Sequence, residues 1–165
     1  MAIQIFDENK IREMSAEIRF KTCKEILENE RDESKRWDAV WMVGELIEGL
    51  DEKNNFRSLV ADLFEWVLRN DTNGVVKHEA SFQIAARNLR QKIPVLTDIA
   101  LNDTSMLSRH EAIEALGLMR AFETEDIIKK IAEDSCVDIR ETAKFVVKRF
   151  QRLKECGEYI PSSIL

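Results

Sequence analysis

The sequence predicts an all-α fold in which four helical hairpins stack into an α-α superhelix. The chain has 165 residues but only 5 Gly and 2 Pro, well below the roughly 12% that these two residues contribute to average proteins. Apolar residues recur at the i, i+3, i+4, i+7 spacing of an amphipathic helix. A short segment that starts with a basic residue and ends with Ala recurs along the chain, which is typical of a repeat protein.

The recurring segments are spaced as helical hairpins would be. They are Arg36-Trp37-Asp38-Ala39, Lys77-His78-Glu79-Ala80, Arg109-His110-Glu111-Ala112 and Arg140-Glu141-Thr142-Ala143. The terminal Ala residues follow one another at intervals of 41, 32 and 31 residues. An acidic residue precedes each segment, at Glu30, Asp71, Asp103 and Asp134. Repeats of this length indicate two antiparallel helices that bury their apolar faces against neighbouring repeats.

Each repeat is expected to contain a first helix, a short turn and a second helix. First helices are predicted near 10–29, 56–70, 92–102 and 124–134, and second helices near 34–50, 75–90, 106–120 and 137–155. Candidate N-caps are Ser34, Asn73, Ser105 and Ser135. A polar loop over 51–55 lengthens the first repeat, and Gly157 and Pro161 are expected to end helical order before a loose tail over 162–165. The chain is therefore predicted to be a single domain over 1–165, with repeats near 10–50, 56–90, 92–120 and 124–155.

Composition excludes several classes of protein. A net charge of -6 provides no general attraction for phosphate backbones, so a nucleic-acid partner is not expected. No stretch approaches the ~18 apolar residues of a membrane span, and the N-terminus lacks the pattern of a signal peptide. Three widely spaced Cys residues fit neither a disulfide framework nor a zinc site, which favours a reducing, cytoplasmic location. No phosphate-binding loop or nucleophile elbow is present.

Both His residues of the chain are followed by Glu, one repeat apart. The pairs are His78-Glu79 in the second repeat and His110-Glu111 in the third. On a helical wheel, each His lies off the core stripe, which in the third repeat consists of Ala112, Ala115, Leu116 and Met119. The two imidazoles are therefore predicted on one common face. They are either ordinary residues of a solvated face or members of a site.

Physical chemistry makes such a face suitable for a metal ion. Neighbouring helices pack about 8–10 Å apart, so two equivalent imidazoles can reach one ion. Imidazole with carboxylate is a ligand set of non-haem iron, although manganese and zinc also accept it. The side chains of consecutive helical residues point about 100° apart around the helix axis, so Glu79 does not easily share an ion with His78. The carboxylates are then free for a second ion or a bound cation, and a symmetric homodimer would bring two His pairs and four Glu together.

The repeat pattern resembles HEAT-like repeats of the short kind found in relatives of phycobilin lyases. Over about 75–150, the sequence also resembles deoxyhypusine hydroxylase, a HEAT-like di-iron mono-oxygenase family built from two halves of four repeats. Each half of that family carries two His-Glu motifs. The resemblance rests on the 32-residue spacing of the two motifs here, on RHEAIEALG at 109–117 and on IRETA at 139–143.

This resemblance implies specific roles for the four residues. His78 and His110 would bind one iron (Fe²⁺), and Glu79 would reach the iron of the opposite half. Glu111 would bind metal or, in preference, the amine of the substrate. The implied reaction is O2-dependent hydroxylation of an aliphatic C–H bond in the deoxyhypusine side chain of a translation factor. The implied substrate is thus a protein or polyamine-like cation.

The chain also departs from the family pattern. It has half the family's length and two motifs instead of four, so a complete site with two irons would require a homodimer. Ala85 stands where the family usually has Gly, beside Phe82 and Gln83. The alternatives are a related HEAT-like metal oxygenase with another substrate, a monomer with one iron, and a non-catalytic HEAT-like adaptor for a protein partner.

Two further features have a structural and a functional interpretation. Trp37 and Trp41, on the equivalent face of the first repeat, either pack at the end of the stack or belong to a dimer surface or substrate groove. The basic residues of the last predicted helix are interpreted as a solvated face.

Overall fold

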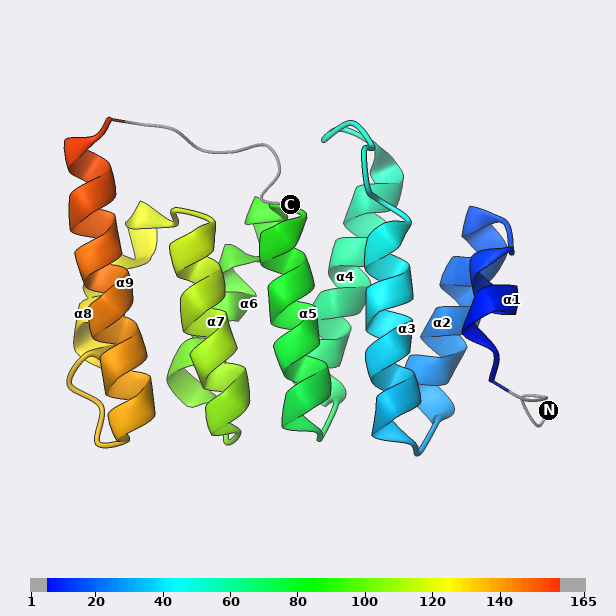
Figure 1. The fold of residues 1–165 in the computed structure, drawn as a ribbon, viewed down its shortest axis with the longest axis horizontal. Helices are drawn as coiled ribbons and strands as arrows, with labels where there is room; N and C mark the ends of the chain where they lie inside the picture. The colour runs from blue at the N-terminus through cyan, green and yellow to red at the C-terminus, as the bar shows by residue number, and fades with distance from the viewer. Residues whose placement is uncertain (1–5, 158–165) are drawn as a thin grey trace.

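The computed structural model describes residues 6–157, and within them every regular element is helical (Figure 1). The α-helices are α1 (Glu8–Arg12), α2 (Ala16–Asn29), α3 (Glu33–Glu45), α4 (Asn55–Asn70), α5 (Gly74–Ala86), α6 (Ile93–Asn102), α7 (Met106–Leu118), α8 (Glu125–Ile131) and α9 (Val137–Glu155). Two 3₁₀ turns, η1 (Arg90–Lys92) and η2 (Phe122–Thr124), lead into α6 and α8. The predicted all-α fold is confirmed. No helix between residues 6 and 157 is both long and apolar enough to cross a membrane.

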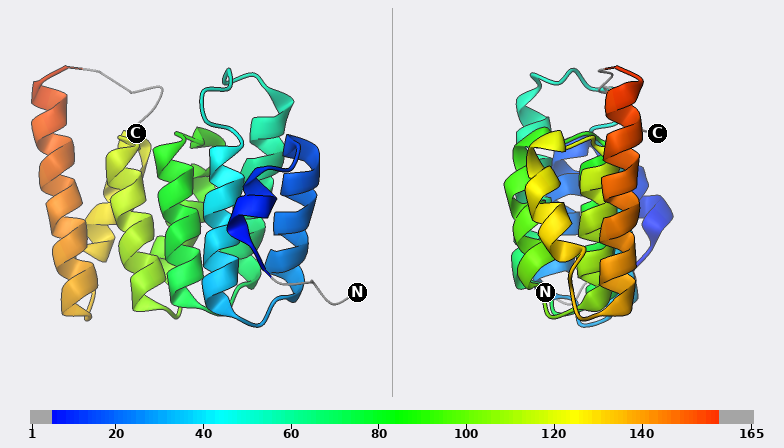
Figure 2. Two further views of the ribbon diagram at one scale, coloured as in Figure 1. Left: turned by 45° about the vertical axis from the view of Figure 1, so that its right-hand side comes forward. Right: turned by 90° about the vertical axis from the view of Figure 1, so that its left-hand side faces the viewer.

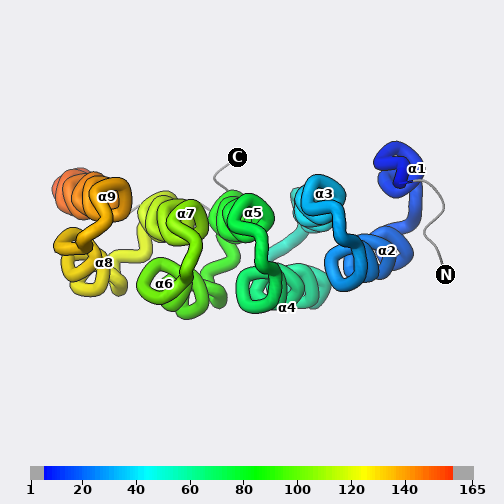
Figure 3. Tube along the Cα trace, turned by 90° about the horizontal axis from the view of Figure 1, so that it is seen from below, coloured from blue at the N-terminus to red at the C-terminus, as the bar shows by residue number. Residues whose placement is uncertain are grey.

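The helices form two layers. Seen along the helices, α3, α5, α7 and α9 lie in one row and α2, α4, α6 and α8 in the other (Figure 3). Consecutive members of the two rows form the four predicted hairpins, and α1 precedes the first. The stack is one hairpin thick when viewed from its end (Figure 2). Second helices of successive repeats therefore lie side by side, as a metal site shared between them requires.

Side-chain caps fix the turn between the two helices in the first three repeats, and two of the four N-caps predicted from the sequence are correct. Asn73 accepts hydrogen bonds from two amides at the start of α5, and Ser105 accepts one at the start of α7. Ser34 is not the N-cap of α3, because Asp32 accepts the Ser34 N–H at 2.9 Å and the helix starts one residue before Ser34. Ser135 is likewise wrong, since Cys136 occupies the cap position of α9 without a side-chain cap hydrogen bond.

Several helix ends differ from the prediction. The stretch predicted as one helix over 10–29 is broken between α1 and α2. The helices α3, α5 and α7 end at Glu45, Ala86 and Leu118, which is five, four and two residues before their predicted ends. After α5 and α7 the chain adopts positive φ at Asn88 (49°) and Arg120 (51°), which ends each helix without a glycine. At the other end α9 stops at Glu155, close to Gly157 (φ 86°) as predicted; Pro161 and residues 162–165 lie outside the described residues.

A ladder of ion pairs explains the recurring basic and acidic residues. The basic residue of each of the first three recurring segments contacts the acid in the turn of the next repeat. The pairs are Arg36–Asp71 (2.7 Å), Lys77–Asp103 (2.6 Å) and Arg109–Asp134 (2.6 Å). At the ends of the ladder, Glu30 pairs with Lys35 of its own repeat, and Arg140 donates to the backbone oxygen of Asp134. These contacts set the register between repeats.

Close packing at small residues holds the layer of second helices together. A Cβ atom at Gly117 would lie 3.0 Å from Cγ2 of Val146, so α7 and α9 approach closely at this point. Ala80 and Ala112 are fully buried between the layers. The core stripes thus face inward, as predicted, and leave the opposite side of each second helix for other contacts.

Candidate metal centre

The recurring segment occupies the same place in every second helix. Trp37, His78, His110 and Glu141 are each the fifth residue of α3, α5, α7 and α9. His78 and His110 therefore occupy equivalent positions on α5 and α7, two helices that lie side by side (Figure 1). Their side chains are 33% and 37% exposed, so both lie off the core, as the helical wheel predicts.

His78 is held by the carboxylate of the next repeat. Its Nε2 atom lies 3.0 Å from Oε2 of Glu111, whose side chain is buried on α7. The hydrogen bond to Glu111 raises the pKa of His78 above its ordinary value, and burial of the ring opposes this effect. A partly buried imidazole and a buried carboxylate thus lie within hydrogen-bonding distance of each other.

His110 has different partners. Its Nδ1 atom lies 2.8 Å from Oγ1 of Thr142 on α9, and its Nε2 atom lies 3.6 Å from Oε1 of Glu114. Thr142 occupies the position that Glu111 holds one repeat earlier. The two contacts follow one rule. Each imidazole contacts the sixth residue of the second helix in the next repeat, which is Glu111 for His78 and Thr142 for His110.

Glu79 is buried and hydrogen-bonded within its own helix. Only 4% of the residue is exposed, and Oε1 accepts a hydrogen bond from Nε2 of Gln83 at 2.8 Å. Burial raises the pKa of Glu79, and the Gln83 hydrogen bond works against that shift. Gln83 is itself fully buried, and its Oε1 atom has no hydrogen-bond donor.

The four predicted ligands are only partly brought together. His78 and Glu111 are in contact, whereas His110 contacts Thr142 and Glu79 contacts Gln83. Across residues 6–157, no three His, Cys, Asp or Glu side chains are close enough to hold one metal ion.

The His78–Glu111 pair nevertheless fits a metal ion. Two ligand atoms bound at right angles with bonds of ~2.1 Å are about 3.0 Å apart, the separation that this pair shows. Imidazole and carboxylate suit a borderline divalent ion such as Fe²⁺. An ion bound at this pair would need further ligands, which would have to come from a movement of His110 or from a second chain.

Thr142 and Gln83 also contact predicted site residues, and the sequence analysis does not identify these two contacts. Aligning the four repeats would have found Thr142. It follows Glu141, which is the residue of the fourth repeat that corresponds to His78 and His110. Gln83 lies four residues after Glu79 on one helix, a spacing that brings side chains into contact.

The aromatic residues of the first repeat are stacked. The rings of Trp37 and Trp41 have centroids 6.1 Å apart at 14°, and those of Trp41 and Phe82 are 6.3 Å apart at 8°. Trp37 is half-buried and packs against the core. Ala85 and Leu89 of the second repeat are buried. The ring stack thus joins α3 to α5 through Trp41 and Phe82.

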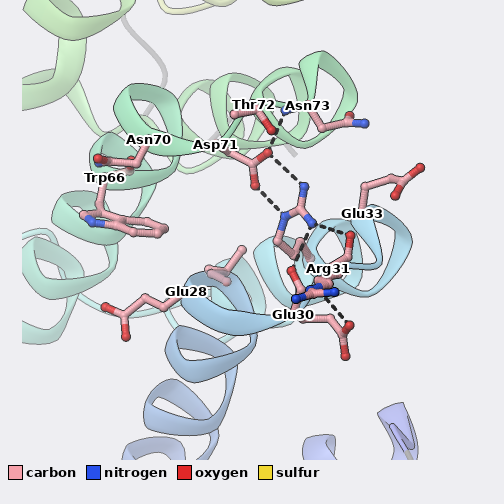
Figure 4. A pocket seen from close by; sticks show the side chains of 11 residues that line it. Glu28, Glu30, Arg31, Glu33, Trp66, Asn70, Asp71, Thr72 and Asn73 are labelled. Carbon is pink, nitrogen blue, oxygen red and sulfur yellow. Dashed lines mark hydrogen bonds and ion pairs between the residues drawn. The ribbon is translucent and has the colours of Figure 1, made fainter.

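Two hollows in the surface of residues 6–157 are lined by neither His78 nor His110. A groove of about 610 Å³ lies at the turns of the first two repeats, between Glu28, Glu30, Trp66 and Asn70, and the Arg36–Asp71 ion pair crosses it (Figure 4). A smaller pocket of about 190 Å³ lies between α7 and α9. It is lined by Glu114, which places it beside His110.

Four stacked hairpins, two of which carry a His-Glu segment on adjacent second helices, define a HEAT-like repeat protein. No family model matches the chain. The chain is 36% identical to deoxyhypusine hydroxylase of Gallus gallus and 35% identical to that of Bos taurus, over 56% of this chain and 31% of each relative. The solved structure of human deoxyhypusine hydroxylase in complex with glycerol has the same fold, with a TM-score of 0.70 and 22% identity over 91% of this chain and 51% of that chain.

The extent of these matches is itself informative. The chain spans about a third of the length of the curated relatives in sequence and about half of the human enzyme in structure. It therefore resembles one half of deoxyhypusine hydroxylase, as the sequence predicts.

Proposed function

We propose that the chain is one subunit of a non-haem di-iron, O2-dependent hydroxylase that resembles deoxyhypusine hydroxylase. The observation that carries the proposal is the contact between His78 and Glu111 across two repeats. It brings together an imidazole and a carboxylate at a ligand–ligand distance, in a chain similar to one half of that enzyme. The substrate in this proposal is a protein or polyamine-like cation, and the location is the cytoplasm.

The site is completed by a homodimer in which the faces of α5 and α7 are opposed. One chain provides the pair His78 and His110, and the partner would provide a second such pair with its carboxylates. This arrangement meets the need for more ligands than one chain brings together. The match of this chain to about half of the human enzyme supports the proposed arrangement.

The residues of the chain have distinct tasks in this proposal. His78 and His110 hold one iron per chain, Glu79 reaches across the interface, and Glu111 binds metal or the cationic group of the substrate. The bound irons would supply activation of O2 for hydroxylation of an aliphatic C–H bond. Before His78 can bind through Nε2, the proton between it and Glu111 must leave, so metal uptake releases protons.

The decisive experiment combines metal analysis with molar mass. Untagged protein is measured by mass spectrometry for metal content and by analytical ultracentrifugation for mass, with 19.2 kDa expected per chain. About one iron per chain in a dimer supports the proposal. Protein that is metal-free, takes up no Fe(II) and stays monomeric at high concentration overturns it, and a non-catalytic adaptor for a protein partner then becomes the better interpretation.

A substrate assay distinguishes the two enzymatic alternatives. The iron-loaded dimer is exposed to O2 with a protein that contains deoxyhypusine and, separately, with free polyamines. Hydroxylation of the protein supports an activity like that of the relatives. O2 consumption only with other amines indicates a related oxygenase with a different substrate.

A further inference from the structure

We propose that Thr142 is a positioning residue that fixes His110 in the Nδ1–H tautomer and leaves its Nε2 lone pair free. Thr142 lies on α9, where the two preceding repeats carry Glu, and it is 9% exposed. The tautomer can be tested without metal, and its use in metal binding rests on the function proposed above.

The direction of the hydrogen bond follows from the second partner of Thr142. Its Oγ1 atom lies 2.7 Å from the backbone oxygen of Asp138, one helical turn earlier. Two oxygens at that distance repel unless a proton lies between them, and a hydroxyl has only one proton to donate. The proton is therefore directed at Asp138.

Toward His110, Thr142 can only accept. Since Nδ1 of His110 lies 2.8 Å from Oγ1, this nitrogen must carry the proton. In a neutral imidazole one nitrogen donates and the other accepts. The Nε2 atom therefore presents a lone pair, and the 3.6 Å to Glu114 is too long for a hydrogen bond that would occupy it.

His78 is in the opposite state. Its Nε2 atom faces the Glu111 carboxylate at 3.0 Å, and a carboxylate only accepts, so Nε2 carries the proton. Two imidazoles that are equivalent in the sequence thus differ, because Thr replaces Glu in the fourth repeat. A His that binds a metal through one ring nitrogen usually donates the N–H of the other nitrogen to a partner that fixes the orientation of the ring. In this chain Thr142 is that partner, because its Oγ1 atom accepts the Nδ1–H of His110.

The test is the tautomer of His110 in the metal-free protein. Long-range ¹H–¹⁵N spectra of ¹⁵N-His protein at alkaline pH, where the rings are neutral, distinguish protonated from unprotonated ring nitrogens. The chain has only 2 His, so a His78→Gln variant assigns the signals. We expect protonated Nδ1 for His110. Protonated Nε2 in the unmodified chain would overturn the proposal.

Two variants separate the hydroxyl from the packing of the side chain. Thr142→Val keeps the shape but cannot accept a hydrogen bond, and His110 is expected to shift toward the Nε2–H tautomer. Thr142→Ser keeps the hydroxyl and is expected to retain Nδ1–H. An unchanged tautomer in Thr142→Val overturns the proposal, and helical circular dichroism together with the His78 signals verifies that each variant is folded.

Metal titration then distinguishes this proposal from the proposed function. With Fe(II) under anaerobic conditions, Thr142→Val is expected to weaken binding by about 10-fold or more, as loss of a partner of a ligand typically does. If the tautomer is as expected but neither the unmodified chain nor any variant binds Fe(II), the proposed function fails and the tautomer assignment stands. If Fe(II) binds equally to both proteins, Thr142 has no positioning role in the metal site.

Discussion

The imidazole of His78 and the carboxylate of Glu111 are 3.0 Å apart, although they belong to different repeats. One position before His78 on α5, Lys77 binds Asp103 in the turn of the third repeat. On α5, therefore, a contact that sets the register between repeats and a contact of the candidate site come from adjacent residues. As a result, the rigid stacking of the hairpins also positions the site residues.

The first prediction concerns the charge state of His78. Replacing Glu111 with Gln is expected to lower the pKa of His78 toward its ordinary value of about 6.5, because the Glu111 hydrogen bond is the main cause of the increase. NMR titration of both rings in metal-free protein measures the change. His110 serves as the internal control, since its partners are Thr142 and Glu114.

The same variant is expected to change the pH dependence of stability. A His whose folded-state pKa is raised stabilises the fold fully below about pH 6.5, and this contribution disappears as pH rises through the folded-state value. Urea unfolding of the unmodified chain should show this loss, and Glu111→Gln should show less of it. A His78 pKa that is the same in both proteins contradicts the assigned contact.

The second prediction concerns the metal ligands. His78→Ala and His110→Ala are each expected to lower Fe(II) affinity at least ~10-fold, with helix content nearly unchanged because both rings lie off the core. Glu141→Ala is the matched control, since Glu141 is the equivalent fifth residue of α9 and its side chain is 60% exposed. Retention of iron by both His variants would remove the proposed site.

A third prediction addresses the ion-pair ladder. Lys77→Met leaves the carboxylate of Asp103 buried without its cation, since the side chains are 14% and 4% exposed. The expected loss is about 3 kcal/mol in the free energy of unfolding, and Lys77→Met with Asp103→Asn should lose less. Urea unfolding measures both. Lys144→Met is the control, because its pair with Glu141 is exposed and contributes at most ~0.5 kcal/mol; equal effects at the two lysines would contradict the role of the ladder.

Much of the fold is predictable because the same sequence pattern, weak in any one repeat, recurs in all four repeats. The interval between Ala80 and Ala112 gives the hairpin length, and the core stripes give the inward face of each second helix. The side-chain caps Asn73 and Ser105 are local and were found. Ser34 was misassigned because Asp32, two residues earlier, caps its amide and competes for the same role. The ends at Asn88 and Arg120 were missed because no glycine marks these positive-φ residues.

The site is less predictable because it depends on contacts between repeats. Helical geometry predicts that His78 and His110 share a face, but the partners are set by the offset between neighbouring helices. That offset brings Glu111 to His78 and Thr142 to His110. A helical wheel drawn for one helix does not contain this information, so Glu111 was paired with its neighbour in sequence instead of with the preceding repeat.

The last prediction tests whether one metal site uses residues from two chains. Glu79→Ala removes the residue proposed to cross the interface, and a His78→Ala/His110→Ala chain lacks the imidazoles. Each variant alone is expected to bind little iron. When the two are unfolded together and refolded as a mixture, half of the dimers pair one chain of each kind, and each such dimer regains one of its two sites. Iron content should therefore recover to roughly a quarter of the unmodified level. If Glu79 instead acts within its own chain, no pairing restores a site and the mixture remains without iron, which would contradict completion of the site across the dimer.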